Sequence, residues 1–96
     1  MNDDSTGSAG DAPRIARVAV VALYDPTSGL IRHLHMAYVY EGADDVSDDM
    51  AVAQAKRYAG QLGHGVNDLG VAVSANAEHG SRPHRIEVES GRFVQR

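Results

Sequence analysis

The chain has 96 residues, of which 43% are hydrophobic and 23% are charged, and this composition is typical of one globular domain rather than of a disordered, fibrous or membrane protein. Its formal net charge of -4 argues against binding to nucleic acid, because a phosphate backbone requires a basic surface. Cysteine is absent, which excludes disulfides and thiolate chemistry. With neither an export signal nor an apolar run of membrane-spanning length, we expect a cytoplasmic protein that does not bind membranes.

The chain begins with a segment that is unlike the rest. Residues 1–13 are acidic and rich in Ser, Gly and Ala, with no periodic apolar residues, which predicts a disordered tail. We expect a single α+β domain over residues 14–96. Its first element is an apolar run rich in β-branched residues at 15–24, and a second run with β-favouring aromatic residues follows at 30–40. These two runs predict a β-hairpin.

Both faces of this hairpin are predicted to be apolar. Its turn contains Asp25, Pro26 and Gly29, which respectively accept hydrogen bonds from the backbone, preset φ and adopt positive φ. Pairing Tyr24 with Leu30 gives a trial register, and alternation of side chains then defines each face. The first face holds Ala16, Val18, Val20, Ala22 and Tyr24 beside Leu30, Arg32, Leu34, Met36 and Tyr38, and the second holds Ile15, Arg17, Ala19, Val21 and Leu23 beside Ile31, His33, His35, Ala37 and Val39.

One helix is predicted after the hairpin. Ser47 is a suitable N-cap, and the acidic Asp48 and Asp49 follow it, where a helix N-terminus favours negative charge. Gly63 is expected to end the helix. Because one helix covers one face of a sheet, we assign it to the first face and expect the second to need another cover. The apolar stripe of the helix is narrow and consists of Ala51, Ala55, Tyr58, Ala59 and Leu62.

Two further strands are predicted at 68–74 and 85–89, and Phe93 and Val94 could form a short fifth strand. The connection from the second strand through the helix to the third strand should be right-handed. This condition is met when the first strand lies between the second and the third. The sequence therefore predicts a ββαββ fold with a four-stranded, mainly antiparallel sheet in the order 2-1-3-4 and the helix on one face.

The turn motif is the basis of a resemblance. Tyr24-Asp25-Pro26 with Gly29, followed by His33, His35 and Gly63-His64, resembles a group of short bacterial α+β proteins of unknown function that share a YDP-x-x-G hairpin. The resemblance extends over residues 18–94 and implies the same topology. It implies no activity, cofactor or catalytic residue.

His33 and His35 are the candidate metal ligands, because side chains two apart on a strand point to the same face and imidazole binds metals. A catalytic zinc usually takes a third protein ligand, which the sequence does not identify. The loop 78–84 contains a Ser, two His and a Glu, without the motif of a nucleophilic serine. No catalytic residue and no cofactor is predicted.

The expected function follows from the uncovered face. A large exposed apolar face usually marks an interface, and two-fold pairing is the commonest form of self-association. The sequence thus favours a non-enzymatic interaction module that forms a homodimer through the helix-free face, with room for an unidentified protein partner. A small metal- or ligand-binding protein or enzyme, with its site around His33 and His35, is the alternative. The expected interface consists of Arg17, Ala19, Val21, Leu23, Ile31, His33 and His35.

Overall fold

The computed structural model describes residues 14–63 and 65–96, so the predicted tail at 1–13 and His64 lie outside the described residues. The architecture is α+β with antiparallel sheets and one main helix, as predicted. The elements are, in order, β1 (Ile15–Tyr24), β2 (Ile31–Tyr40), α2 (Asp48–Gln61), the 3-10 helix η2 (Val66–Asp68), β3 (Gly70–Ser74), the short helix α3 (Glu78–Ser81), β4 (His84–Glu87) and β5 (Arg92–Gln95).

The predicted hairpin turn is confirmed. The Asp25 carboxylate accepts hydrogen bonds from the backbone N–H of Thr27 at 2.8 Å and of Ser28 at 3.3 Å. These bonds, with a smaller effect of Arg32, lower the pKa of Asp25. Gly29 has a φ of 80°, which glycine adopts without strain. The residue types that predicted the turn therefore make its hydrogen bonds.

The register of the hairpin differs from the trial pairing by two residues. Leu23 pairs with His33 rather than with Ile31, and a register shift follows between Leu23 and Tyr24. A slip of two residues keeps every side chain on its own face, so the predicted composition of both faces holds beyond the shift. Ile31 is an exception, because the irregularity brings it opposite Tyr24 and against the core that contains Ala22. A second register shift, between Ile15 and Arg17, brings Ile15 opposite Tyr40.

Helix α2 begins as predicted. The side chain of Ser47 accepts a hydrogen bond from the backbone N–H of Met50 at 3.2 Å, and Asp48 and Asp49 occupy the first turn. Three small side chains, Ala51, Ala55 and Ala59, are fully buried against the sheet. Small residues allow the helix axis to lie close to the strands. Tyr58 and Leu62 of the predicted stripe are exposed instead.

Ser47→Ala is expected to destabilise the protein by about 1 kcal/mol, because the Met50 N–H loses its capping partner. Urea denaturation followed by circular dichroism at 222 nm measures the loss of free energy of unfolding. Ser81→Ala, at an exposed position of α3, is the control and should change stability little. Equal effects of the two substitutions would contradict the capping role.

The prediction of one four-stranded sheet is wrong. The first three strands have the expected order, β2-β1-β3, but β4 pairs with β5 in a separate two-stranded sheet. After β3, Asn76 Oδ1 accepts from the backbone N–H of Glu78 at 3.0 Å at the start of α3, which turns the chain under the sheet instead of along the edge of β3. The fifth strand expected at Phe93 and Val94 is present as β5.

The face covered by α2 is also the opposite of the one assigned from the sequence. Ala19, Val21 and Leu23 of β1 and Ala37 of β2 form one core with the buried alanines of α2. The face that contains His33 and His35 is therefore not helix-free. Three residues of the expected interface are at most 1% exposed and lie beneath the helix, namely Ala19, Val21 and Leu23.

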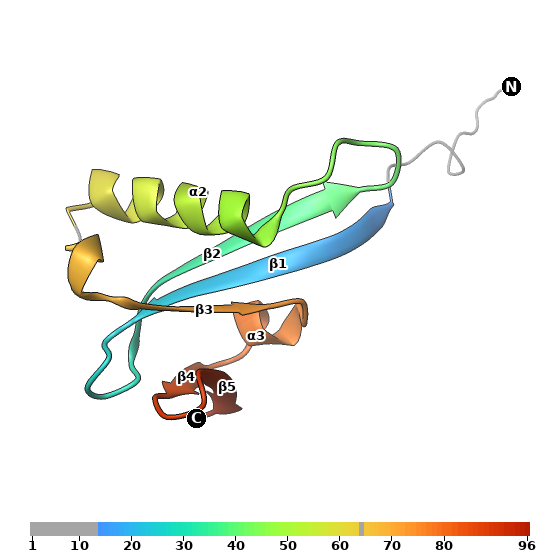
Figure 1. Cartoon of the computed structure of the whole chain (residues 1–96). Coiled ribbons are helices and arrows are strands. Elements are labelled where there is room, and N and C mark those ends of the chain that lie inside the picture. Colours follow the sequence, from blue (N-terminus) through green and yellow to red (C-terminus); the bar gives the residue numbers. More distant parts are fainter. Residues whose placement is uncertain (1–13, 64) are drawn as a thin grey trace, which may run out of the picture.

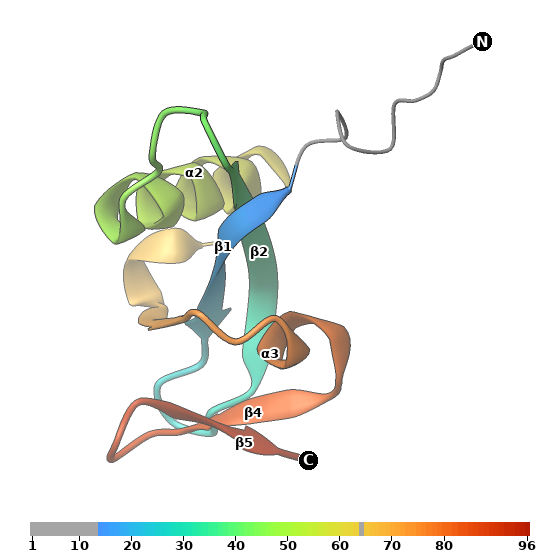
Figure 2. The same ribbon diagram turned by 90° about the vertical axis from the view of Figure 1, so that its right-hand side faces the viewer.

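The chain itself also covers much of the other face (Figures 1 and 2). Ile86 of β4 packs against Ala22 and Ala72 in a second core, with Phe93 beside it. The Ile86 N–H donates to the carbonyl oxygen of Gly29 at 2.8 Å, which attaches β4 to the hairpin turn. The need for cover on two faces was correctly predicted, and the segment α3-β4-β5 supplies part of the second cover.

Candidate functional site

The residues of the expected interface are divided among three environments. Ala19, Val21 and Leu23 belong to the core under α2. Arg17 binds the start of the helix: its guanidinium contacts Asp45 at 3.1 Å and Asp48 at 3.5 Å and donates to the Val46 carbonyl oxygen. The hydrogen bond with Asp45 is the main cause of the raised pKa of Arg17. These residues stabilise the fold of the single chain.

His33 and His35 lie on the α2 side of β2, since their partners across the hairpin are Leu23 and Val21. His35 Nε2 lies 3.2 Å from Gln54 Oε1, and its ring centroid lies 5.3 Å from that of Tyr58. Because an amide oxygen only accepts, His35 Nε2 carries the hydrogen of this bond. The structure therefore joins His35 to the helix rather than presenting Nε2 to a metal.

The edge of β2 is open and is flanked by exposed apolar side chains. β2 pairs on one side with β1 and is the outermost strand of the three. On the face opposite α2 it carries Leu34, Tyr38 and Tyr40, which are 37%, 46% and 43% exposed. Beside the other face lies a groove along α2 lined by Met50, Ala53, Gln54 and Arg57. We call the edge and these flanking side chains the β2 edge surface.

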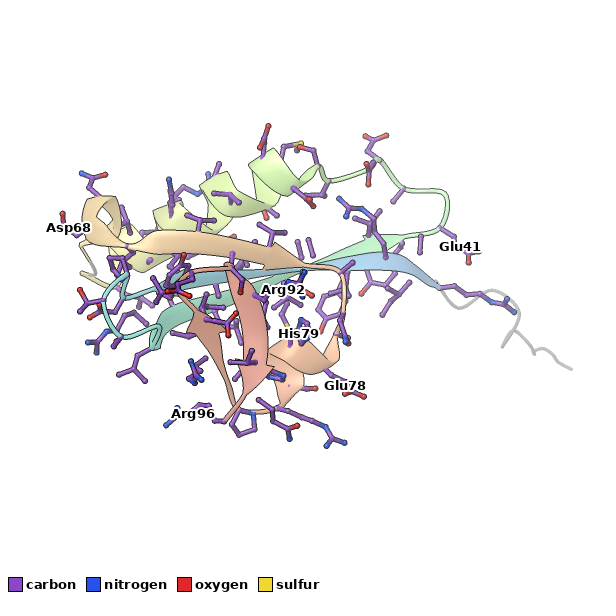
Figure 3. All side chains as sticks on the ribbon, turned by 60° about the horizontal axis from the view of Figure 1, so that its bottom comes forward. Glu41, Asp68, Glu78, His79, Arg92 and Arg96 are labelled. Atoms are coloured by element: carbon purple, nitrogen blue, oxygen red, sulfur yellow. The ribbon has the colours of Figure 1, made fainter. Side chains whose placement is uncertain are left out.

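A second site candidate brings together side chains from four elements. Ser74 at the end of β3 places Oγ 2.6 Å from His79 Nδ1, and His84 of β4 lies with its ring centroid 4.9 Å from that of His79. Phe93 of β5 stacks on His79 at 4.7 Å with 10° between the rings. In Figure 3, His79 points inward from α3 and Glu78 points outward. We call these four side chains the His79 cluster.

The surroundings of His79 favour its neutral form. Burial is the main cause of its lowered pKa, the nearby His84 adds to the effect, and Glu78 opposes it. Ser74 Oγ also accepts from the Asn76 N–H at 3.0 Å, which holds the serine in the turn after β3. The sequence pointed to the two histidines and to Ser81 of the loop 78–84, but not to Ser74. Ser74 lies outside that loop and comes close to His79 only because the chain turns at Asn76.

No group of three or more candidate metal ligands occurs among residues 14–63 and 65–96. In the same part of the chain, no helix combines the length and apolarity needed to cross a membrane. The chain matches no protein-family model, no curated protein and no solved structure. The arrangement of the described residues is therefore the basis for a functional assignment.

Proposed function

We propose that this protein is a non-enzymatic interaction module that forms a homodimer by antiparallel pairing of two β2 strands. The observation that supports the proposal is the open edge of β2. An edge strand presents unpaired N–H and C=O groups, and proteins usually block such an edge with charge, proline or a bulge in its middle. β2 contains one formally charged residue, Arg32, and no proline.

The position of Arg32 leaves the middle of the edge uncharged. It lies near the hairpin turn, where its guanidinium contacts the Asp25 carboxylate at 3.4 Å. From His33 to Tyr40, the strand has no acidic or basic residue apart from its histidines. Two copies that pair near the middle of β2 would thus avoid opposing like charges. Pairing would also cover part of the exposed Leu34 and Tyr38.

Helix α2 supports the same symmetry. A two-fold axis between the β2 strands would place both helices on one side of a continuous sheet, running antiparallel. Because strands lie about 4.8 Å apart and α2 lies over β1 and β2, the two helix axes would be about 10 Å apart, a normal helix packing distance. The side of α2 that faces β2 carries Gln54 and Tyr58, which both contact His35, and Met50 one turn earlier. In antiparallel helices centred near Gln54, Met50 of each copy would lie near Tyr58 of the other.

The full-length protein is expected to have twice its chain mass of 10.2 kDa at high micromolar concentration in size-exclusion chromatography with light scattering. Tyr38→Lys should weaken the dimer at least about tenfold, or ~1.4 kcal/mol, because it adds a charge at the edge. Its circular dichroism spectrum should stay unchanged, since Tyr38 is 46% exposed.

Val73→Lys is the matched control, because Val73 is an exposed apolar residue on β3, the other outer strand of the sheet. This variant should remain dimeric. Met50→Lys should also weaken the dimer, because it would place a charge between the two helices. A monomeric wild type, or a dimer that Val73→Lys disrupts and Tyr38→Lys does not, would disprove pairing through β2.

A further inference from the structure

We infer that His79 and His84 form a binding site for a divalent transition-metal ion, with Zn²⁺ as the suitable probe. The site lies on α3 and β4, under the face opposite α2, and goes beyond the proposed dimer. It differs from the His33 and His35 pair that the sequence suggested. The inference rests on the spacing of the rings and on the hydrogen bonds of their Nδ1 atoms.

The separation of the rings fits a shared metal ion. An imidazole nitrogen lies about 2.0–2.1 Å from a zinc ion that it binds, which puts the ring centroid about 3.2 Å from the ion. When the angle N–Zn–N is about 90–110°, the centroids of two bound rings are therefore roughly 4.5–5.2 Å apart. The centroids of His79 and His84 are 4.9 Å apart, with 68° between the ring planes. The separation of the two rings is therefore compatible with a shared ion.

Both histidines are held through Nδ1. His84 Nδ1 lies 2.7 Å from the Arg82 carbonyl oxygen, which can only accept, so neutral His84 has its lone pair on Nε2. His79 Nδ1 lies 2.6 Å from Ser74 Oγ, and a hydroxyl oxygen can accept the Nδ1 hydrogen in the same way. Histidine ligands are commonly oriented by such a bond from the nitrogen that does not bind the metal. In this state both Nε2 atoms are available.

The neighbours of His79 supply orientation and charge. Stacking on Phe93 fixes the plane of the His79 ring. The Glu78 carboxylate acts on His79 in the direction that favours positive charge. Two imidazoles supply part of a coordination shell, and solvent or a group from another molecule would complete it.

The other histidine pair lacks this arrangement. Side chains two apart on a strand are separated by about 6.6 Å along the chain, and His35 Nε2 already donates to Gln54. A substitution at His35 is therefore the natural control. It removes an imidazole from the same chain without touching the His79 cluster.

The test is a titration of the full-length protein with ZnCl₂, followed by imidazole ¹H–¹⁵N correlation spectra. The Nε2 resonances of His79 and His84 should shift together and saturate at one equivalent. His79→Gln and His84→Gln should each weaken Zn²⁺ binding at least about tenfold, and Ser74→Ala should weaken it by roughly tenfold because the His79 ring loses its anchor. His35→Gln should bind like the wild type.

The wild-type spectra decide the question even if a His79 variant folds poorly, because they report on the unaltered cluster. Unchanged Nε2 resonances of His79 and His84 at excess Zn²⁺ would overturn the inference. So would Zn²⁺ affinity that survives in a folded His84→Gln variant, or that is lost in His35→Gln. Backbone amide spectra of each variant establish that it is folded.

Discussion

Gly29→Ala is expected to destabilise the protein by about 3 kcal/mol, since a left-handed φ costs alanine ~1–2 kcal/mol and a lost hydrogen bond ~1 kcal/mol. Gly29 has a φ of 80°, and a Cβ there would overlap the carbonyl oxygen of Ile86. The overlap would break the bond from the Ile86 N–H to the Gly29 carbonyl oxygen. Urea denaturation measures the loss, and the near-ultraviolet spectrum should report loosened packing around Phe93.

Gly42→Ala separates the two causes. Gly42 has a nearly identical φ of 83°, but a Cβ there would have no atom within 4 Å. This variant should lose only the conformational part, about 1 kcal/mol. The difference between the variants then measures the attachment of β4 to the hairpin. Equal losses would show that β4 does not depend on Gly29.

Val21→Glu is expected to unfold the protein. Val21 is 0% exposed and packs among the alanines under α2, so the variant would bury a carboxylate in an apolar core. Such a change costs several kcal/mol, on the order of 4 or more, which approaches the whole stability of a small protein. Circular dichroism and the dispersion of amide resonances would show the loss of structure.

Leu34→Glu is the control on the opposite face of the same hairpin. Leu34 is 37% exposed, so this variant should remain folded while its self-association weakens. A folded, monomeric Val21→Glu variant would mean instead that α2 does not cover Val21. It would restore the interface that the sequence suggested.

Local features of the sequence predicted local features of the fold. Asp25 and Gly29 make the turn, and Ser47 caps α2, because each acts on backbone groups only a few residues away. The alternation of side chains gave the composition of each hairpin face. The register was two residues off because Tyr24 pairs with Ile31 rather than Leu30 and a further shift lies between Leu23 and Tyr24. Neither irregularity changes the apolar pattern.

The choice of face for α2 could not be read from apolarity, because both faces of β1 are apolar. A right-handed crossover does fix the face, but only when the direction of each side chain relative to its backbone hydrogen bonds is known. The apolar pattern does not reveal that direction. The sequence therefore placed Val20 under the helix and Val21 on the uncovered face, whereas Val21 lies under α2 and Val20 lies on the opposite face. Both residues are fully buried.

The His79 cluster lay beyond sequence reasoning for a different reason. Its parts come from β3, α3, β4 and β5, and they meet only because the chain crosses beneath the sheet after Ser74. The expected fourth strand beside β3 would have kept them apart. The alternation around Ile86 predicted a strand correctly, but it did not reveal which surface Ile86 would cover.

The two faces of the hairpin are covered at different times during synthesis of the chain, one by α2 and the other by the segment α3-β4-β5. The hairpin and α2 are synthesised before residues 75–96, which bring Ile86 and Phe93 to the second core. At typical rates of synthesis, about 5–20 residues per second, Val20 and Ala22 stay without their cover for roughly one to four seconds. During that interval, the nascent chain exposes an apolar strand surface that chaperones recognise and that favours aggregation.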